Sequence, residues 1–296
     1  MKIAYYPGCS LHSTAREYDA SFRAVCELLD IELVEPKDWI CCGTTPAHSS
    51  DHLLSVAMPL ESVRQAEEEG FDKIVVPCAS CFQRLKTAVH EVTEDPELLE
   101  TVNKVLEGPF KNTVKVIHPL EMFLERDIKR NIEYLKKEHA LSKLPVACYY
   151  GCLLVRPPKV MRLDQHEYPV KMDEVLALAG IKTVDWRAKT SCCGASFSLT
   201  ETDLVHELTN KIFDEAKTAG AKAISVACPL CHSNLDTRQR EIEKKFETEY
   251  NLPILYFTQL LGLAMGISPE KLEIKRHLTS TESIFQAPPE LPAETA

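Results

Sequence analysis

The chain lacks two features that often indicate a partner: an excess of positive charge and a long apolar segment. It has 34 Lys and Arg residues against 44 Asp and Glu residues, a formal net charge of −10. This balance argues against nucleic acid or an anionic membrane as the main partner, since both attract basic surfaces. The longest apolar stretch, near residues 252–267, is interrupted by Thr258 and Gln259 and is too short to span a bilayer. With no recognisable signal peptide, the sequence predicts a cytoplasmic protein with no membrane partner.

Glycine is also scarce, with 10 in 296 residues, and four of them adjoin cysteines. Cysteine is abundant: there are 12, and ten follow one plan that occurs twice. Each copy has a cysteine preceded by glycine, an adjacent pair followed by glycine, and a Cys-x-x-Cys motif. The first copy is Cys9, Cys41, Cys42, Cys78 and Cys81, and the second is Cys152, Cys192, Cys193, Cys228 and Cys231. Corresponding positions are about 150 residues apart, which indicates two duplicated domains.

Five thiols in each copy indicate a sulfur-ligated metal centre, because cysteine-rich cytoplasmic proteins more often bind metals or perform redox chemistry than form disulfides. Soft thiolates favour iron–sulfur clusters. Five ligands exceed the four of a regular cubane, which points to an open or fused cluster, or to a cubane with an exchangeable ligand. Two alternatives stay open: a structural zinc site in each half, and a thioredoxin-like dithiol in either Cys-x-x-Cys motif. Cys26 and Cys148 fall outside the plan and are expected in the core.

Apolar and turn patterns predict the same alternation of strands and helices in both halves. The expected strands are 2–6, 31–35, 73–76, 114–117, 146–150, 181–185, 223–227 and 254–257. The expected helices are 13–30, 49–69, 81–92, 172–179 and 203–219, with two more near Pro119 and Gln259. This order predicts an α/β fold of two duplicated domains, each a small, mostly parallel sheet flanked by helices. The expected domains are 1–143 and 144–276, and residues 277–296 are expected to form a mobile C-terminal tail.

Each cysteine group follows a predicted strand, so the five thiols of each half are expected to meet at one edge of its sheet. Several cationic side chains are close to these cysteines in the sequence. His48 and Arg156 are the strongest candidates for binding an anionic substrate group or for delivering a proton to a departing thiolate. Other cations, more typical of a solvated surface, are His12, Arg16, Arg84, Lys86, Lys159 and His232.

The cysteine motifs resemble those of the CCG domain, a cysteine-rich module named for its Cys-Cys-Gly sequence. The segments that carry the resemblance are Tyr6-Pro7-Gly8-Cys9-Ser10, Cys41-Cys42-Gly43-Thr44, Val76-Pro77-Cys78-Ala79-Ser80-Cys81, Gly151-Cys152-Leu153, Cys192-Cys193-Gly194-Ala195 and Ala227-Cys228-Pro229-Leu230-Cys231. Two copies with little else resemble the B subunit of heterodisulfide reductase over nearly the whole chain. Leu153 stands where methanogen-type members are expected to have histidine, so the stretch 149–158 is more similar to bacterial relatives.

The resemblance implies two noncubane [4Fe-4S] clusters that face each other, one held by the five cysteines of each copy. It implies reductive cleavage of a disulfide, either the coenzyme M–coenzyme B heterodisulfide or an analogous low-molecular-weight disulfide. The implied partners are the ferredoxin-like C subunit of the reductase, its flavin-containing A subunit, which bifurcates electrons, and a hydrogenase or formate dehydrogenase module. Two other functions stay open: an electron relay that binds no small substrate, and a zinc-stabilised docking scaffold.

Overall fold

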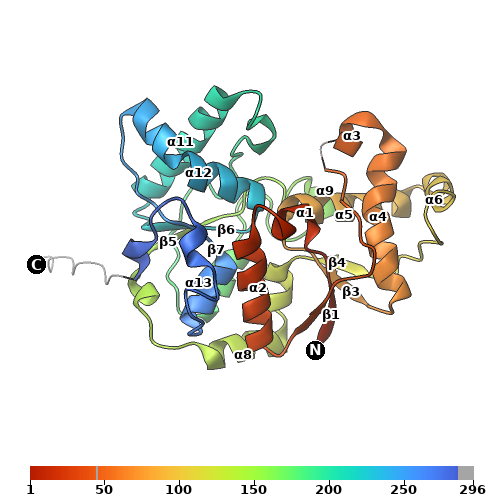
Figure 1. Cartoon of the computed structure of the whole chain (residues 1–296), viewed down its shortest axis with the longest axis horizontal. Coiled ribbons are helices and arrows are strands. Elements are labelled where there is room, and N and C mark those ends of the chain that lie inside the picture. Colours follow the sequence, from red (N-terminus) through yellow and green to blue (C-terminus); the bar gives the residue numbers. More distant parts are fainter. Residues whose placement is uncertain (45, 286–296) are drawn as a thin grey trace, which may run out of the picture.

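A computed structural model gives the fold of residues 1–44 and 46–285 (Figure 1). It contains two parallel sheets flanked by helices, one sheet in each half of the chain. The predicted α/β fold is therefore confirmed. The strands are β1 (Lys2–Tyr5), β2 (Glu32–Val34), β3 (Lys73–Val75), β4 (Lys115–Ile117), β5 (Val146–Tyr149), β6 (Ala223–Val226) and β7 (Ile254–Tyr256).

The strand orders of the two sheets correspond. The first sheet has the order β2-β1-β3-β4, and the second has the order β5-β6-β7 with every pairing parallel. All seven strands are short, and all except β2 are mostly buried, as expected when helices cover a parallel sheet. Because every strand of a sheet runs in one direction, the loops after the strands meet at one edge.

The helices occupy most of the remaining chain. In the first half they are α1 (Gly8–His12), α2 (Arg16–Leu28), α3 (Pro46–Ser50), α4 (His52–Glu68), α5 (Ala79–Glu94), α6 (Pro96–Asn103), α7 (Pro119–Phe123), α8 (Arg126–Leu135) and the 3-10 helix η1 (Ala140–Lys143). In the second half they are α9 (Pro158–Met161), α10 (Lys171–Leu178), η2 (Ala195–Phe197), α11 (Thr202–Thr218), α12 (Pro229–Phe246), α13 (Phe257–Ala264), η3 (Ile274–Arg276) and η4 (Glu282–Ile284). The sequence patterns did not predict α6, α8 or α12.

The strand expected at 181–185 is reduced to a single parallel bridge between Thr183 and Val146. Val146 donates to the Lys182 carbonyl and accepts from Val184, both at 2.9 Å. The ladder stops there because the indole Nε1 of Trp186 donates a hydrogen bond to the Cys148 carbonyl, at 3.0 Å. A side chain thus occupies the acceptor that the next backbone bond of a parallel ladder would use.

The long helix expected at 49–69 is divided into α3 and α4. Asp51 stands between them in an extended conformation, and its carboxylate accepts a hydrogen bond from the Leu54 backbone at 2.8 Å. Asp51 is thus the N-cap of α4, a role that aspartate favours because it satisfies a free N–H of the first turn.

The two halves meet through an aromatic and polar contact between α2 and α13, which lie side by side in Figure 1. Tyr18 of α2 stacks on Tyr256, with ring centroids 4.1 Å apart and an interplanar angle of 9°. The hydroxyls of Ser21 and Thr258 are 2.7 Å apart. The buried apolar residues of both halves form one continuous core. The halves are therefore held as one body.

Residues 277–285, assigned from the sequence to the mobile tail, are held against α12. The Asp236 carboxylate accepts hydrogen bonds from the backbone N–H groups of Leu278 (2.8 Å) and Thr279 (2.9 Å), and Ile284 is buried. One carboxylate thus holds a segment of little apolar pattern against α12, and the mobility predicted for the tail stays a prediction. The rest of the expected tail, 286–296, lies outside the described residues.

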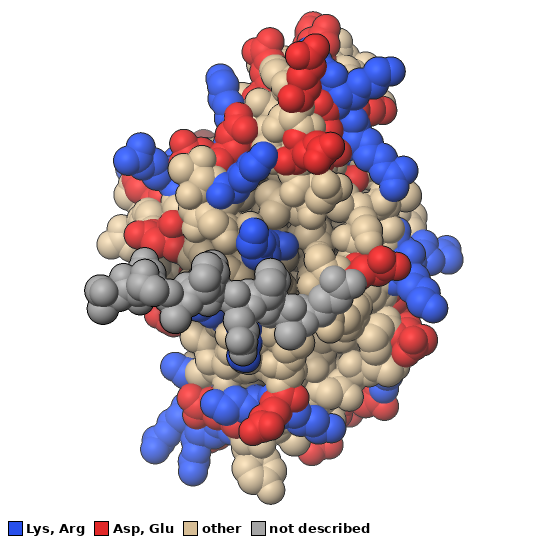
Figure 2. Space-filling model, turned by 90° about the vertical axis from the view of Figure 1, so that its left-hand side faces the viewer, with Lys and Arg blue, Asp and Glu red and all other residues tan. Residues whose placement is uncertain are grey.

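Figure 2 shows the molecule turned by 90° from the view of Figure 1. In the part of this face that is not covered by undescribed residues, charged side chains of both signs are intermixed. The described part of this face therefore presents a mixed field instead of a field of one sign.

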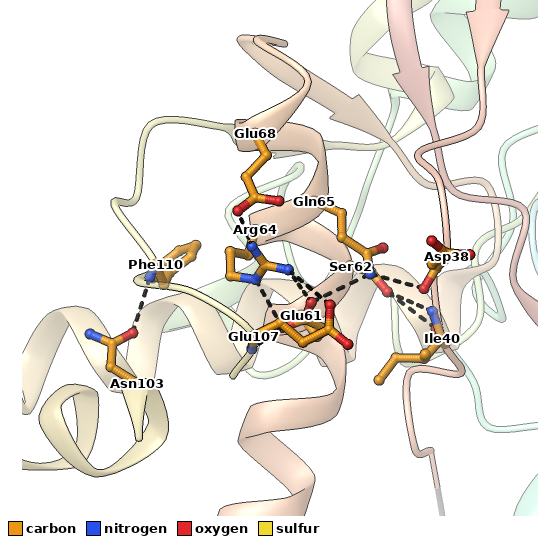
Figure 3. A network of polar contacts seen from close by, with 10 residues as sticks. All are labelled: Asp38, Ile40, Glu61, Ser62, Arg64, Gln65, Glu68, Asn103, Glu107 and Phe110. Atoms are coloured by element: carbon orange, nitrogen blue, oxygen red, sulfur yellow. Dashed lines mark hydrogen bonds and ion pairs between the residues drawn. The ribbon is translucent and has the colours of Figure 1, made fainter. Parts of the chain in front are cut away.

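The loop that leads to the first cysteine pair is tied to α4 (Figure 3). The Ser62 hydroxyl lies 3.2 Å from both the N–H and the carbonyl oxygen of Ile40. The Gln65 side chain donates to the Asp38 carbonyl at 2.9 Å. Because Cys41 follows Ile40 directly, these bonds fix where the pair begins.

Arg64, at the centre of Figure 3, holds this part of α4 in place. Its side chain is 3% exposed and forms ion pairs with Glu61 and Glu68. Hydrogen bonding from the guanidinium lowers the pKa of the Glu61 carboxyl, which itself is only 9% exposed. Removing one partner of such a buried ion pair strongly destabilises the fold, because the other partner would remain charged and unpaired.

We predict that Arg64→Leu lowers the free energy of unfolding by about 3 kcal/mol at neutral pH, since Glu61 is left without its partner. Urea unfolding followed by circular dichroism measures this loss. The difference in the free energy of unfolding between wild type and variant should become smaller as the pH falls. Wild type loses the pair's contribution as pH falls through the lowered pKa of Glu61, whereas in the variant the unpaired carboxyl becomes neutral at higher pH.

The matched control is Lys104→Leu, which removes an ion pair with Glu100 whose side chains are 67% and 75% exposed. That change should cost less than about 0.5 kcal/mol, because exposed pairs contribute little. Equal losses in the two variants would contradict the role given to Arg64.

Candidate metal centre

All ten cysteines of the repeated plan line one cavity of about 660 Å³, to which both halves contribute. The cavity lies at the carboxyl ends of the strands, as expected from the position of each cysteine group after a strand. Six of the ten thiols are buried, and Cys9, Cys41 and Cys192 are exposed. Each adjacent pair has one exposed and one buried member, because successive side chains diverge.

In the first half, the backbone before Cys9 lies against a sulfur atom. Gly8 has φ +65°, and a Cβ atom added there would lie 2.9 Å from the Sγ atom of Cys81. The Sγ atoms of Cys42 and Cys81 are 3.4 Å apart. Glycine is required here both for the left-handed backbone and for the close approach to sulfur.

The second half repeats this geometry. Gly151 has φ +66°, and an added Cβ atom would lie 2.9 Å from the Sγ atom of Cys231. The Sγ atoms of Cys193 and Cys231 are 3.6 Å apart. The duplication therefore extends from the cysteine spacing to the local geometry of the thiols.

A tyrosine in each half joins two of the cysteine loops. The Tyr6 hydroxyl donates to the Ile40 carbonyl at 2.7 Å, and the Tyr149 hydroxyl donates to the Ser191 carbonyl at 2.6 Å. In both cases the acceptor is the residue just before the adjacent cysteine pair. Neither tyrosine was among the predicted site residues, although the tyrosine that shortly precedes Gly-Cys in both copies is a signal that could have identified them.

The thiols of each half have pKa values that move in opposite directions. Hydrogen bonding from Cys41 lowers the pKa of Cys42 to about 3, while the same interaction raises the pKa of Cys41. In the second half, hydrogen bonding from Cys152 lowers the pKa of Cys192 to about 6 and raises that of Cys152. Neighbouring thiols thus share protons, because adjacent thiolates repel one another.

This donor set fits a sulfur-ligated metal group. Thiolates bound tetrahedrally to one metal at about 2.3 Å are about 3.8 Å apart. The Sγ separations of 3.4 and 3.6 Å are close to that value. A metal group would also supply the positive charge that lets all five thiols of a half ionise.

Of the predicted cationic candidates, His48 and Arg84 line the cavity and Arg156 does not. Arg156 instead donates to the Thr190 carbonyl at 3.2 Å and pairs with Glu167 at 3.4 Å. Arg156 is therefore not part of the cavity wall, but it lies near the second cysteine pair: after the hydrogen bond from Cys152, its charge also lowers the pKa of Cys192.

The other predicted cations also lie off the cavity wall. His12 contacts Glu35 at 3.3 Å, Lys86 donates to the Met161 carbonyl at 2.7 Å, and His232 is buried beside His277. Arg16 and Lys159 are exposed.

The two walls of the cavity differ in polarity. The non-cysteine residues of the first half are Ser10, Thr44, His48, Ser49, Ala79, Ser80, Gln83 and Arg84, and those of the second half are Tyr150, Leu153, Ala195, Ser196, Ser198, Leu199, Thr200 and Leu230. The first wall is therefore polar and cationic, and the second carries the apolar side chains.

Cys26 and Cys148 are absent from the cavity wall. Both are buried, Cys26 in α2 and Cys148 in β5. Burial raises the pKa of both thiols, as expected for cysteines that serve as small core residues.

Comparison with known proteins identifies the class. The model of the cysteine-rich domain CCG matches residues 3–86 and 146–236, one match in each half. The chain therefore belongs to the CCG cysteine-rich domain family. The two matched segments contain both copies of the cysteine plan.

Within this family the chain is similar to the B subunit of heterodisulfide reductase, as the sequence motifs predicted. It is 31% identical over 283 residues to the B subunit of the Ferredoxin/F(420)H(2)-dependent CoB-CoM heterodisulfide reductase of Methanosarcina acetivorans, covering 93% of each chain. It is 30% identical to the B subunit of the Ferredoxin:CoB-CoM heterodisulfide reductase of Methanosarcina mazei, again covering 93% of each chain. It is also 27% identical to the 8-methylmenaquinol:fumarate reductase membrane anchor subunit of Wolinella succinogenes, over 94% of this chain and 96% of that one.

The fold is also present in a solved structure. A hypothetical protein from Helicobacter pylori superimposes with a TM-score of 0.71 at 12% identity, over 94% of this chain and 52% of that one. This chain thus spans about half the length of that protein. In the part of the chain that the structure describes, no helix combines the length and the apolar character needed to cross a membrane.

We predict that Gly8→Ala and Gly151→Ala each remove about half of the bound metal, because the new methyl group meets the sulfur of Cys81 or Cys231 at 2.9 Å. Metal per chain, measured after anaerobic purification, checks this. The control is Gly180→Ala, which has φ +77° but no atom within 4 Å of the added Cβ. It should keep its metal and lose only about 1–2 kcal/mol from backbone strain. Metal loss in the control would show that strain alone explains the effect.

Proposed function

We propose that this chain is the disulfide-reducing B subunit of a heterodisulfide reductase complex. It cleaves a low-molecular-weight disulfide between two noncubane [4Fe-4S] clusters. The observation that carries this proposal is the single cavity whose wall contains both five-cysteine sets. Cleavage consumes two electrons and two protons and releases two thiols, so a substrate held between two equivalent centres suits the duplication.

The proposed ligands of one cluster are Cys9, Cys41, Cys42, Cys78 and Cys81, and those of the other are Cys152, Cys192, Cys193, Cys228 and Cys231. Their soft sulfur donors suit iron. When bound, the clusters supply the electrons for the reduction.

The remaining wall residues bind and orient the substrate in this proposal. Arg84 is buried, its Nη2 donates to the Ser55 carbonyl at 2.8 Å, and its Nε has no hydrogen-bond partner among the described residues. A buried guanidinium N–H without an acceptor is costly, so an anionic substrate group near it is stabilised. His48 is exposed on the same wall, where its imidazole can hold a proton for a departing thiolate.

The polarity of the walls supports a mixed disulfide as the substrate class. An anionic end suits the wall of Arg84 and His48, and an apolar end suits the wall of Leu153, Leu199 and Leu230. The coenzyme M–coenzyme B heterodisulfide named for the relatives and analogous mixed disulfides both belong to this class.

The similarity to heterodisulfide reductase supports the proposed partners: its C subunit, which would donate electrons, its flavin-containing A subunit, and a hydrogenase or formate dehydrogenase module. The similarity to the membrane anchor of a fumarate reductase favours a second candidate, an electron relay between protein partners. Disulfide reduction with a dye as donor separates the two, because a relay has no small disulfide substrate. A cytoplasmic location stays a prediction.

We predict that anaerobically purified protein contains about eight irons and eight acid-labile sulfides per chain, as two four-iron clusters require. Inorganic sulfide and metal analysis measure both. Two zinc ions per chain with negligible sulfide would instead establish the scaffold alternative.

We predict that Cys42→Ser and Cys193→Ser each keep about half of the iron, since oxygen is a harder ligand than sulfur and only one set is changed. Both variants should nevertheless lose nearly all reduction of a mixed disulfide by reduced viologen dye, because each end of the substrate requires its own centre. Cys26→Ala is the matched control: this cysteine is buried but off the cavity wall, so iron and activity should persist.

Activity above about a tenth of wild type in a variant that verifiably lacks one cluster would contradict the paired mechanism. A tenfold loss corresponds to only about 1.4 kcal/mol in the barrier, too little for removal of a reacting centre. Full iron content in wild type, with dye oxidation but no disulfide reduction, would favour the relay.

A further inference from the structure

Three metal-binding side chains converge outside the cysteine cavity: His232, Asp236 and His277. One potential ligand atom from each lies within 4.8 Å of the other two. His232 and Asp236 are four residues apart on α12, so they share one face of that helix. His277 follows η3, and both α12 residues are buried. A protected site of mixed nitrogen and oxygen donors thus joins α12 to the C-terminal segment.

The tautomer of His277 follows from its neighbours. Its Nε2 lies 3.0 Å from Oε1 of Gln259. That oxygen also accepts from the Tyr256 backbone at 2.9 Å, and the Gln259 Nε2 donates to the Leu272 carbonyl at 3.1 Å, which fixes the amide orientation. The His277 Nε2 therefore carries the hydrogen, and its Nδ1 presents a lone pair.

That lone pair points at a second imidazole, since Nδ1 of His277 is 2.9 Å from Nε2 of His232. An ion bound by both rings takes the place of the proton between these two nitrogens. The outer N–H of His277 donates to the amide oxygen of Gln259, comparable to the carbonyl oxygens that receive this N–H in histidine metal ligands.

The separations are close to those of a bound ion. Two nitrogens at about 2.1 Å from one tetrahedral metal are about 3.4 Å apart. The observed separation is 2.9 Å, so one ring has to shift by about 0.5 Å to take up an ion. The Asp236 carboxylate supplies negative charge close by, and its two backbone hydrogen bonds from Leu278 and Thr279 hold it in place while leaving further lone pairs.

We propose that His232, Asp236 and His277 bind one divalent first-row transition-metal ion, at a site separate from the ten cysteines. Two imidazoles and one carboxylate are a ligand set of zinc and non-haem iron, and three protein ligands leave further positions for water. The ion clamps the C-terminal segment to α12. It also steadies the second cysteine set, because His232 follows Cys231 directly and stacks on Tyr256 with centroids 4.5 Å apart.

Zinc is the probe that tests this site in the cluster-containing protein. One equivalent of Zn²⁺ is added anaerobically, excess is removed by dialysis, and the zinc environment is measured by X-ray absorption. Wild type should retain about one zinc per chain with nitrogen and oxygen ligands at about 2.0–2.1 Å and no sulfur at about 2.3 Å. This separates the proposed site from zinc bound by cysteines.

His277→Gln and Asp236→Asn should weaken zinc binding at least tenfold while keeping the iron content. The matched control is His206→Gln, which changes another buried histidine of the second half, 3.2 Å from the Glu241 carboxylate. The control should bind zinc like wild type.

The proposal is overturned if wild type retains no zinc, as expected if the two imidazoles only share a proton. It is also overturned if the retained zinc has sulfur ligands, or if both variants bind zinc as tightly as wild type. Should a variant fail to fold, the ligand environment in wild type still decides between these results.

Discussion

The stacking of Tyr18 on Tyr256 is the contact on which the arrangement of the site depends. The two rings, 4.1 Å apart, come from different halves of the chain. The Tyr18 hydroxyl also donates to the Pro77 carbonyl at 3.3 Å, immediately before Cys78. One side chain thus links the interface between the halves to a cysteine loop. Together with the Ser21–Thr258 contact and the continuous core, this stack holds the halves so that both cysteine sets line one cavity.

Within each half, the thiols are positioned by backbone more than by side chains. Gly8 and Gly151 let the chain pass next to a sulfur atom, and Tyr6 and Tyr149 hold the adjacent pair against the same turn. These glycine and tyrosine contacts occur in both halves.

The hydrogen bonds that hold the surrounding loops differ between the halves. In the first half the loop before the cysteine pair is tied to Ser62 and Gln65 of α4. In the second half, Asn234 of α12 donates to the Cys193 carbonyl at 3.0 Å and accepts from Ser198. The supports have diverged while the thiol geometry has stayed the same, which indicates that the sulfur positions, and not the surrounding loops, carry the function.

The sequence predicts most of what depends on local pattern. The parallel α/β order and the ten cysteines follow from strand periodicity and motif spacing, and the structure brings those cysteines together. It does not predict what depends on a single distant partner. The strand predicted near Thr183 is reduced to one bridge because the indole of Trp186 donates a hydrogen bond to the Cys148 carbonyl. Arg156 is off the cavity wall and contacts Thr190 and Glu167 instead, and nothing in local spacing distinguishes it from Arg84.

Under the proposed function, the unequal walls of the cavity have a consequence for the selection of the disulfide substrate. Arg84 and His48 belong to one wall, and the leucines belong to the other. A symmetric disulfide held between them would always place one of its ends on the unfavourable side, either a charge against leucine or an apolar chain against a guanidinium. Discrimination then comes from the mismatched end as much as from the matched one. Under the proposed function, the difference between the two walls would therefore select disulfides whose two ends differ in polarity.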